Sequence, residues 1–196
     1  MTVSAREVYR GRLIRVEVHP LPQGEHDVVR HPGAAAVLPV TPAGEVLLVR
    51  QFRPAIGQHL VEIPAGLLDQ REEDALSCAA RELREETGFT HRTIEFLGGY
   101  YSSAGFTDEY VHLFLATVGE EPDGPPEEGT QLLRRPFAEM VAAARAGRAS
   151  GSRKLCEEAH VVLEEQPQVG DTVLEHGEPI QPHPESEPGH FFRVVS

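Results

Sequence analysis

Three glutamates near the middle of the chain have a spacing that could bind metal ions. Glu82, Glu85 and Glu86 lie in the segment 81–89, which reads Arg-Glu-Leu-Arg-Glu-Glu-Thr-Gly-Phe. At about 100° per residue, a helix places Glu82 and Glu86 one above the other, with Glu85 to the side of them. Carboxylate oxygens are the ligands that hard divalent cations prefer. The spacing therefore predicts a cation site on one face of a helix.

The position of these charges is unfavourable for the helix alone. Glu85 and Glu86 fall in the last turn before Gly88, where the backbone dipole disfavours each negative charge by about 0.3–1 kcal/mol. Glu82 and Glu86 also repel each other at the i,i+4 spacing. Arg81 can pair with Glu85, which leaves Glu82 and Glu86 the least neutralised. The alternative is a solvated acidic surface without a function, which is what many charge runs are.

Hydrophobic periodicity predicts the elements that position this cluster. A helix is expected from Asp74 to Thr87, with Gly88 as its C-terminal cap. Pro64, Ala65 and Gly66 indicate a turn before it. The apolar stripe of the helix comprises Leu76, Ala79, Ala80 and Leu83, with the methyl group of Thr87 at its edge. Strands are expected at 8–18, 28–29, 34–40, 46–52, 60–63, 93–101, 110–118 and 131–134, and further helices at 137–145 and 153–164.

Composition excludes several classes of protein. The chain has 196 residues and a formal charge of −13, from 18 Lys and Arg against 31 Asp and Glu. This length fits one domain, and the negative charge without a basic patch argues against nucleic-acid binding. No apolar run approaches the roughly 20 residues of a membrane span, and the N-terminus does not resemble a secretory signal. A cytoplasmic protein without a membrane partner is expected. Cys78 and Cys156 are too few for a disulfide framework.

The segment from Gly66 to Phe89 resembles the Nudix box. Residues 81–89 match the second half of that pattern completely: Arg-Glu, an aliphatic residue, any residue, Glu-Glu, any residue, Gly and an apolar residue. In the first half, Glu73 has the family's seven residues before Arg81 but six, rather than five, after Gly66. Glu72 would keep the first spacing and break the second. Glu73 is preferred because a loop absorbs an insertion more easily than a helix does.

This resemblance implies an α/β Nudix fold, with a mixed β-sheet between α-helices and an N-terminal antiparallel β-segment. It implies an enzyme that hydrolyses a nucleoside diphosphate derivative with Mg²⁺ or Mn²⁺. The implied metal ligands are Glu82, Glu85, Glu86 and the carbonyl of Ala65, and Arg81 would hold Glu85 or Glu73 in place. The chain then divides into 1–33, the N-terminal β-segment; 34–165, the Nudix domain; and 166–196, whose proline and glycine content predicts an extended tail.

Flanking segments are similar to the ADP-ribose and ADP-sugar pyrophosphatase branch. These are Arg-Gln-Phe-Arg-Pro at 50–54, Glu-Ile-Pro-Ala-Gly-Leu at 62–67 and Gly-Phe-Thr-Asp-Glu at 105–109. The branch implies hydrolysis to AMP and a sugar phosphate, and the implied substrate-binding residues are Arg53, Glu62, Gly105 and Glu109. Ala104 stands where many members carry proline. Alternative activities are therefore hydrolysis of a GDP-sugar or dinucleoside polyphosphate, or binding of ADP-ribose without cleavage. A surface role remains the alternative for Arg53 and Glu109.

The branch also implies a general base and a quaternary structure. The base comes from an acidic loop after a core strand, here 119–129, in which Glu127 is the first choice and Glu128 the second. Glu85 is a further ligand or an acid partner in catalysis. A flexible acidic loop without a role is the alternative. Residues 1–33 resemble the segment that relatives exchange across a two-fold axis, so a homodimer is expected.

Overall fold

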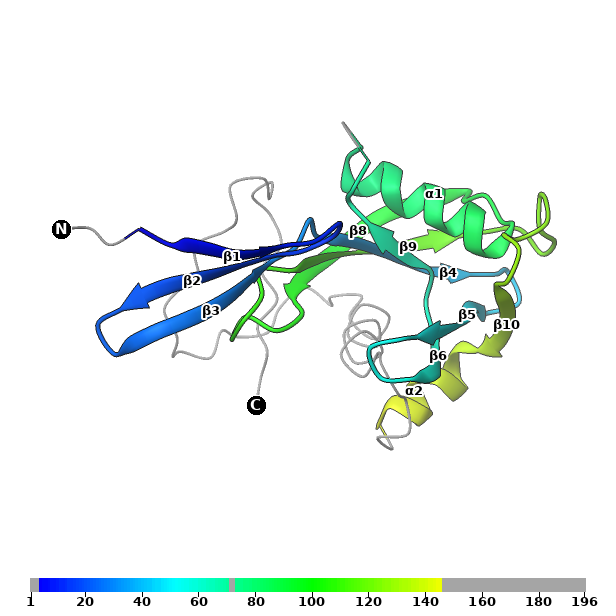
Figure 1. Ribbon diagram of the computed structural model, residues 1–196. Helices are drawn as coiled ribbons and strands as arrows, with labels where there is room; N and C mark the ends of the chain where they lie inside the picture. Colours follow the sequence, from blue (N-terminus) through cyan, green and yellow to red (C-terminus); the bar gives the residue numbers. More distant parts are fainter. Residues whose placement is uncertain (1–3, 71–72, 146–196) are drawn as a thin grey trace, which may run out of the picture.

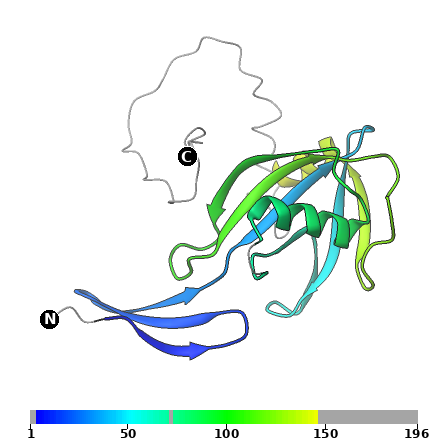
Figure 2. The ribbon, with the colours of Figure 1, turned by 90° about the horizontal axis from the view of Figure 1, so that it is seen from above.

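The computed structural model describes residues 4–70 and 73–145 of the chain (Figure 1). Its N-terminal part is a three-stranded antiparallel sheet in the order β1-β2-β3. This sheet extends away from the rest of the molecule, as the view from above shows (Figure 2). Its strands are β1 (Arg6–Arg10), β2 (Arg15–Leu21) and β3 (Gly24–Arg30). The expected N-terminal antiparallel segment is therefore present.

The second sheet has seven strands and is mixed. Its main order is β10-β5-β4-β9-β8, with β6 paired to β5 and β7 paired to β4. The β4–β9 pair is parallel, and the other pairs are antiparallel. The central strand β4 thus has neighbours that come from distant parts of the chain. The strands are β4 (Ala34–Val40), β5 (Glu45–Arg53), β6 (Gln58–Glu62), β7 (Ala65–Leu67), β8 (Thr93–Tyr101), β9 (Tyr110–Thr117) and β10 (Gln131–Pro136).

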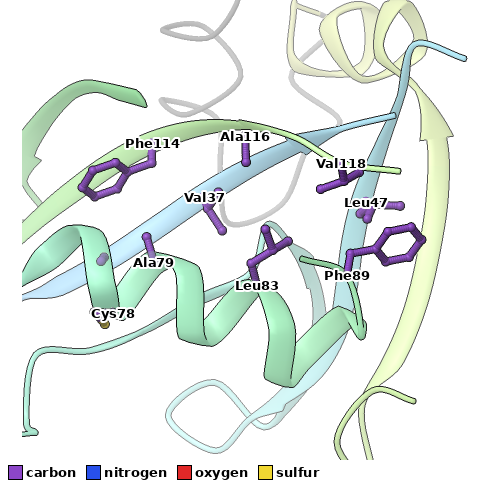
Figure 3. Packing of buried hydrophobic residues seen from close by; sticks show 10 residues of the cluster. Val37, Leu47, Cys78, Ala79, Leu83, Phe89, Phe114, Ala116 and Val118 are labelled. Atoms are coloured by element: carbon purple, nitrogen blue, oxygen red, sulfur yellow. The ribbon is translucent and has the colours of Figure 1, made fainter. Parts of the chain in front are cut away.

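Helices α1 (Ala75–Thr87) and α2 (Phe137–Arg145) pack against two different apolar clusters of this sheet. Successive residues of a strand point to opposite faces, so Ala35 and Val37 pack with α1 while Ala36 and Leu38 belong to the cluster that α2 joins. The α1 side is drawn in Figure 3. The expected α/β architecture is confirmed. Within the described residues, no helix is long and apolar enough to cross a bilayer.

Helix α1 is held by its apolar face and by both ends. Ala79 and Leu83 are fully buried in the cluster of Figure 3, and burial of a leucine side chain contributes roughly 1.5–3 kcal/mol. At the start, Asp74 Oδ1 accepts a hydrogen bond of 2.7 Å from Ser77 N. At the end, Gly88 adopts φ 77°, a left-handed conformation that favours glycine, and its N–H donates to Arg84 O. The predicted helix and both of its ends are confirmed.

The structure differs from the sequence prediction at several places. The run 8–18 is divided by a turn in which Gly11 N donates to Ile14 O. The expected turn at 64–66 is wrong, because Ala65 begins strand β7, whose pairing with β4 satisfies the backbone of a proline- and glycine-containing segment. Leu76 is 45% exposed and lies outside the apolar face. The predicted helix 153–164 and the predicted tail 166–196 lie outside the described residues.

We predict that Asp74→Ala lowers the free energy of unfolding by about 1 kcal/mol, the usual cost of losing a helix N-cap. The Ser77 N–H donates to the Asp74 carboxylate, which holds the pKa of that group below its ordinary value of 3.8. The charged form is therefore the stabilising one. The ionised carboxylate contributes fully to the free energy of unfolding above pH 3.8. This contribution is lost as the pH falls through the lowered pKa of Asp74 in the folded protein.

The matched variant is Asp74→Asn, which keeps a side-chain acceptor but cannot titrate. Urea denaturation at pH 7 should give nearly wild-type stability for Asp74→Asn and reduced stability for Asp74→Ala. Repeating the series between pH 5 and pH 2 should lower the stability of wild type relative to Asp74→Asn, because only the wild-type side chain becomes protonated. Equal stability of all three proteins at pH 7 would contradict the N-cap assignment.

Candidate active site

Arg81 on α1 lies among three carboxylates. Its Nε and Nη2 donate to the two oxygens of Glu73 at 2.8 and 2.9 Å. Its Nη1 donates to Glu82 at 2.5 Å and to Glu85 at 3.0 Å. The guanidinium holds the pKa of Glu73 below its ordinary range, and the carboxylates raise the pKa of Arg81.

This geometry refines the sequence prediction. Arg81 was expected to hold Glu85 or Glu73, and it contacts both. The expectation that Glu82 is one of the two least neutralised acids is wrong, because the rotamer of Arg81 that reaches Glu85 also brings Nη1 to Glu82. The contact with Glu73 also favours Glu73 over Glu72 as the glutamate of the first half of the motif; Glu72 lies outside the described residues.

Glu86 is the most buried acid of the cluster, with 7% of its surface exposed. Its Oε2 accepts a hydrogen bond of 3.1 Å from Ala65 N of β7, and its Oε1 accepts one from Gln51 Nε2 of β5. Burial raises the pKa of Glu86 to about 7, although these two hydrogen bonds and the positive charge of Arg53 act in the opposite direction. A cation would therefore stabilise the ionised form of this side chain.

Gln51 is a site residue that sequence reasoning missed. It lies in the quoted segment 50–54, from which only Arg53 was selected. Residues two apart on a strand point to the same face. That periodicity, applied to Arg53, is the signal that could have identified Gln51.

The carboxylate of Glu82 lies directly against the backbone of Gly66. A Cβ atom at position 66 would lie only 1.8 Å from Glu82 Oε1 and 2.0 Å from Glu82 Cδ. Strand β7 therefore approaches α1 closely because residue 66 has no side chain. Burial raises the pKa of Glu82, and the hydrogen bond from Arg81 opposes this shift. Ala65 and Gly66 thus form one wall of the carboxylate cluster.

Two further predicted residues form an ion pair beside this cluster. Arg53 Nε, at the end of β5, donates to Glu62 Oε2, at the end of β6, at 2.7 Å. The positive charge of Arg53 acts to lower the pKa of Glu86, against the larger effect of burial. The side chain of Arg53 remains 42% exposed. It can therefore contact a ligand in solvent while Nε stays bonded to Glu62.

The loop 119–129 lies against the C-terminal end of α1. Glu127 N donates to Glu85 O at 2.7 Å. Residues of both segments, including Glu85 and Glu127, line a cavity of about 410 Å³. Glu128 is the next residue and is exposed. The predicted base candidates are therefore placed beside the helix that carries the carboxylates.

Gly105 and Glu109 belong to a separate group, in the loop between β8 and β9. Gly105 O accepts a hydrogen bond from His26 Nε2 of β3 at 2.9 Å. Glu109 accepts from the hydroxyl of Ser102, and its Oε1 lies 3.6 Å from His31 Nδ1. No hydrogen bond or ion pair joins Gly105 or Glu109 to the cluster around Arg81 in the described part of the chain.

Asp108 attaches this loop to the N-terminal sheet. Its Oδ2 accepts from Arg30 Nη1 at 3.0 Å, and its Oδ1 accepts from His31 N at 2.8 Å. The backbone of Val29 adds two bonds, one donated to Phe106 O and one accepted from Asp108 N. The loop that carries Ala104 is therefore positioned by contacts with β3 rather than by a proline.

Comparison with known proteins decides the family. The NUDIX domain model matches residues 29–159, which is more than half of the chain. This chain belongs to the Nudix family. The resemblance predicted from residues 81–89 is confirmed.

Relatives within the Nudix family include two ADP-ribose pyrophosphatases. That of Bacillus subtilis (strain 168) is 42% identical over 145 residues, covering 71% of this chain and 76% of the relative. That of Mycobacterium tuberculosis (strain ATCC 25618 / H37Rv) is 37% identical over 131 residues, covering 64% and 63%. The GDP-mannose pyrophosphatase of Cronobacter sakazakii (strain ATCC BAA-894) is 32% identical over 154 residues, covering 69% and 80%. The predicted branch, and with it a Nudix pyrophosphatase, is confirmed.

Nudix hydrolases generally need a divalent metal ion. Among residues 4–70 and 73–145, no three His, Cys, Asp or Glu side chains are already arranged to hold one, because Arg81 lies between the carboxylates. The donor set nevertheless fits such an ion. It offers hard oxygen ligands, and Glu82 lies in the space that a side chain at position 66 would fill.

We predict that Gly66→Ala weakens divalent-ion binding roughly 10- to 100-fold, the usual range for changes that displace a ligand indirectly. The new methyl group would occupy the position of the Glu82 carboxylate. Glu82→Gln should weaken binding at least as much, because it removes the charge itself. Isothermal titration with Mg²⁺ and Mn²⁺ measures both effects.

Glu95→Gln is the matched control, since it removes one exposed carboxylate from β8, away from these contacts. Circular dichroism would establish that all three variants fold. Wild-type Mg²⁺ affinity in a folded Gly66→Ala protein would rule out the proposed importance of the contact between Gly66 and Glu82.

Proposed function

We propose that this Nudix protein hydrolyses the pyrophosphate bond of ADP-ribose or a related ADP-sugar, giving AMP and a sugar phosphate. The observation that carries the proposal is the carboxylate cluster of α1, held around Arg81 and against β7. The two ADP-ribose pyrophosphatases among the relatives support the choice of substrate. Mg²⁺ or Mn²⁺ is the proposed cofactor.

Glu82, Glu85, Glu86 and the carbonyl of Ala65 are proposed to hold the metal. A bound divalent ion would neutralise phosphate oxygens and polarise an attacking water. Arg81 places a positive charge beside Glu82 and Glu85 and holds them close together, and Gln51 fixes the orientation of Glu86. Each of these residues lies on α1 or on a strand next to it, so the ligands are positioned before a substrate binds.

Arg53 is proposed to bind the diphosphate. Its guanidinium presents several N–H donors in a plane, a geometry that suits phosphate oxygens. The ion pair with Glu62 fixes Nε and therefore the plane of the group. Gly105 and Glu109, in the loop joined to the N-terminal sheet, are proposed to contact the part of the substrate farther from the metal.

Glu127 is proposed as the general base that removes a proton from the attacking water, with Glu128 as the second choice. Its backbone is bonded to Glu85 O, beside the proposed metal ligands. A general base typically contributes 10²–10⁴-fold to the rate. Glu85 would contribute as a metal ligand and as a charged partner of Arg81.

A second substrate class has support of its own. One relative is a GDP-mannose pyrophosphatase, and Ala104 departs from the proline of the ADP-ribose branch. The loop that carries Ala104 is positioned by Asp108 and Val29. Binding of ADP-ribose without cleavage is disfavoured by the presence of every acid of the segment 81–89.

We predict that ADP-ribose with Mg²⁺ is cleaved to AMP and ribose 5-phosphate, and that GDP-mannose is cleaved more slowly. Phosphorus NMR of a panel of nucleoside diphosphate derivatives identifies the substrate and both products. Adding a chelator should stop the reaction, and excess Mg²⁺ should restore it. Cleavage of GDP-mannose but not of ADP-ribose would contradict the proposed substrate. Tight binding of ADP-ribose without turnover would contradict the proposed hydrolase activity.

The N-terminal segment 1–33 is proposed to mediate a homodimer, with 34–165 as the catalytic domain. Exposed apolar side chains on β1 and at the following turn support this proposal, among them Val8, Tyr9 and Leu13. Sedimentation at micromolar concentration should therefore give a dimer, and Tyr9→Glu should shift it toward monomer. A wild-type monomer under these conditions would contradict the proposal. A cytoplasmic location stays a prediction.

A further inference from the structure

The last carbonyl groups of a helix have no partner within the helix. At the end of α1, backbone N–H groups of the loop 119–129 supply the missing donors. Gly88 O accepts from Asp123 N at 2.9 Å and from Gly124 N at 3.1 Å, while Glu85 O accepts from Glu127 N at 2.7 Å. The loop therefore caps the helix that carries the carboxylate cluster.

Asp123 forms two hydrogen bonds with the segment that follows α1, one through its side chain and one through its backbone. Its Oδ2 accepts a hydrogen bond of 2.8 Å from Thr90 N, while its own N–H donates to Gly88 O. These two bonds enclose Phe89, which is fully buried. One loop residue is thus tied to both sides of a residue anchored in the core.

Two further contacts restrict the loop. Arg134 of β10 donates from Nη2 to Glu120 O at 2.9 Å, and its guanidinium lies 5.3 Å from the centre of the Phe89 ring. On the helix side, a Cβ at position 88 would lie 2.1 Å from Gly124 O. The loop and the helix end therefore approach as closely as glycine allows.

We propose that Asp123 is a positioning residue whose carboxylate fixes the loop on α1, so that Glu127 is held beside Glu85 for catalysis. This inference rests on the proposed hydrolysis, and it adds a residue that the motif does not contain. Asp123 precedes Glu127 by four residues, and both line the cavity at the end of α1. Loss of the Asp123 carboxylate removes the bond to Thr90 N, so that only backbone bonds, from Asp123 N, Gly124 N and Glu127 N, still join the loop to the end of α1.

The charge of Asp123 is not required for this role. A carboxylate near a helix C-terminus is disfavoured by the dipole, and only an acceptor is needed for Thr90 N. Asn supplies that acceptor, so Asp123→Asn should keep the loop in place. Asp123→Ala removes the side-chain acceptor of the Thr90 N–H. Glu121→Ala is the matched control, because it removes an exposed carboxylate from the same loop.

Steady-state kinetics should show a kcat about 10- to 100-fold lower in Asp123→Ala, the scale of a displacement of about 1 Å at a reacting group. The KM and the Mg²⁺ affinity should stay within about twofold of wild type, since Asp123 contacts neither the proposed ligands nor Arg53. Asp123→Asn and Glu121→Ala should retain the wild-type kcat. A kcat unchanged in Asp123→Ala, or equally low in Asp123→Asn, would overturn the inference.

A double-mutant cycle separates positioning from a structural effect. If Asp123 acts through Glu127, Asp123→Ala should reduce the kcat of a Glu127→Gln protein by less than about twofold. If the two residues acted independently, the fold-losses in kcat of the two single variants would multiply in the double variant. The same cycle with Glu128→Gln should be multiplicative. Multiplied losses in the Glu127 cycle would overturn the inference.

Amide hydrogen exchange tests the contact without any substrate. Exchange at Thr90 N and Glu127 N should accelerate at least tenfold in Asp123→Ala and remain slow in Asp123→Asn and Glu121→Ala. Unchanged exchange at both amides would overturn the inference even if hydrolysis is observed. A wild-type protein that cleaves no nucleoside diphosphate derivative would instead overturn the proposed function.

Discussion

The interaction on which the site depends is the contact of one guanidinium with three carboxylates. Glu73 precedes the N-cap of α1, and Glu82 and Glu85 lie on the helix, so the convergence of these three negative charges is unfavourable without a counter-charge. Arg81 supplies it with bonds of 2.5–3.0 Å to all three. Because the contacts are partly buried, the attraction is screened less than at an open surface. The acidic cluster is therefore compatible with a stable helix before a metal ion arrives.

The sheet contributes the remaining walls of the site through one short strand. β7 has three residues, yet it pairs with the central strand β4, donates to Glu86 and lies against Glu82. β4 is in turn fixed by its parallel pairing with β9 and by apolar contacts on both faces. The buried central strand of the sheet is thus directly joined, through β7, to the residues proposed for catalysis.

Local patterns allowed much of this arrangement to be predicted from the sequence. The ends of α1, β8 and α2 follow from capping residues and periodicity, and the residues 81–89 identified the family. Strand β7 was missed because it depends on pairing with β4, far away in the chain. Gln51 was missed although it lies two residues from Arg53 on the same face of β5, because its partner, Glu86, lies on α1. The second contact of Arg81, with Glu82, depends on a rotamer, which residue spacing does not determine. The attachment of Gly105 to His26 spans 79 positions and has no local signal.

The connection between β3 and the loop that carries Ala104 has a mechanical consequence. Arg30, His31 and Val29 bind Asp108 and Phe106 through side-chain and backbone groups together. Because these bonds join the N-terminal sheet to the loop, a displacement of the sheet is expected to displace the loop as well. Under the proposed function, substitutions in the N-terminal sheet would therefore change the substrate preference of the loop, while the ion pairs around Arg81 stay intact.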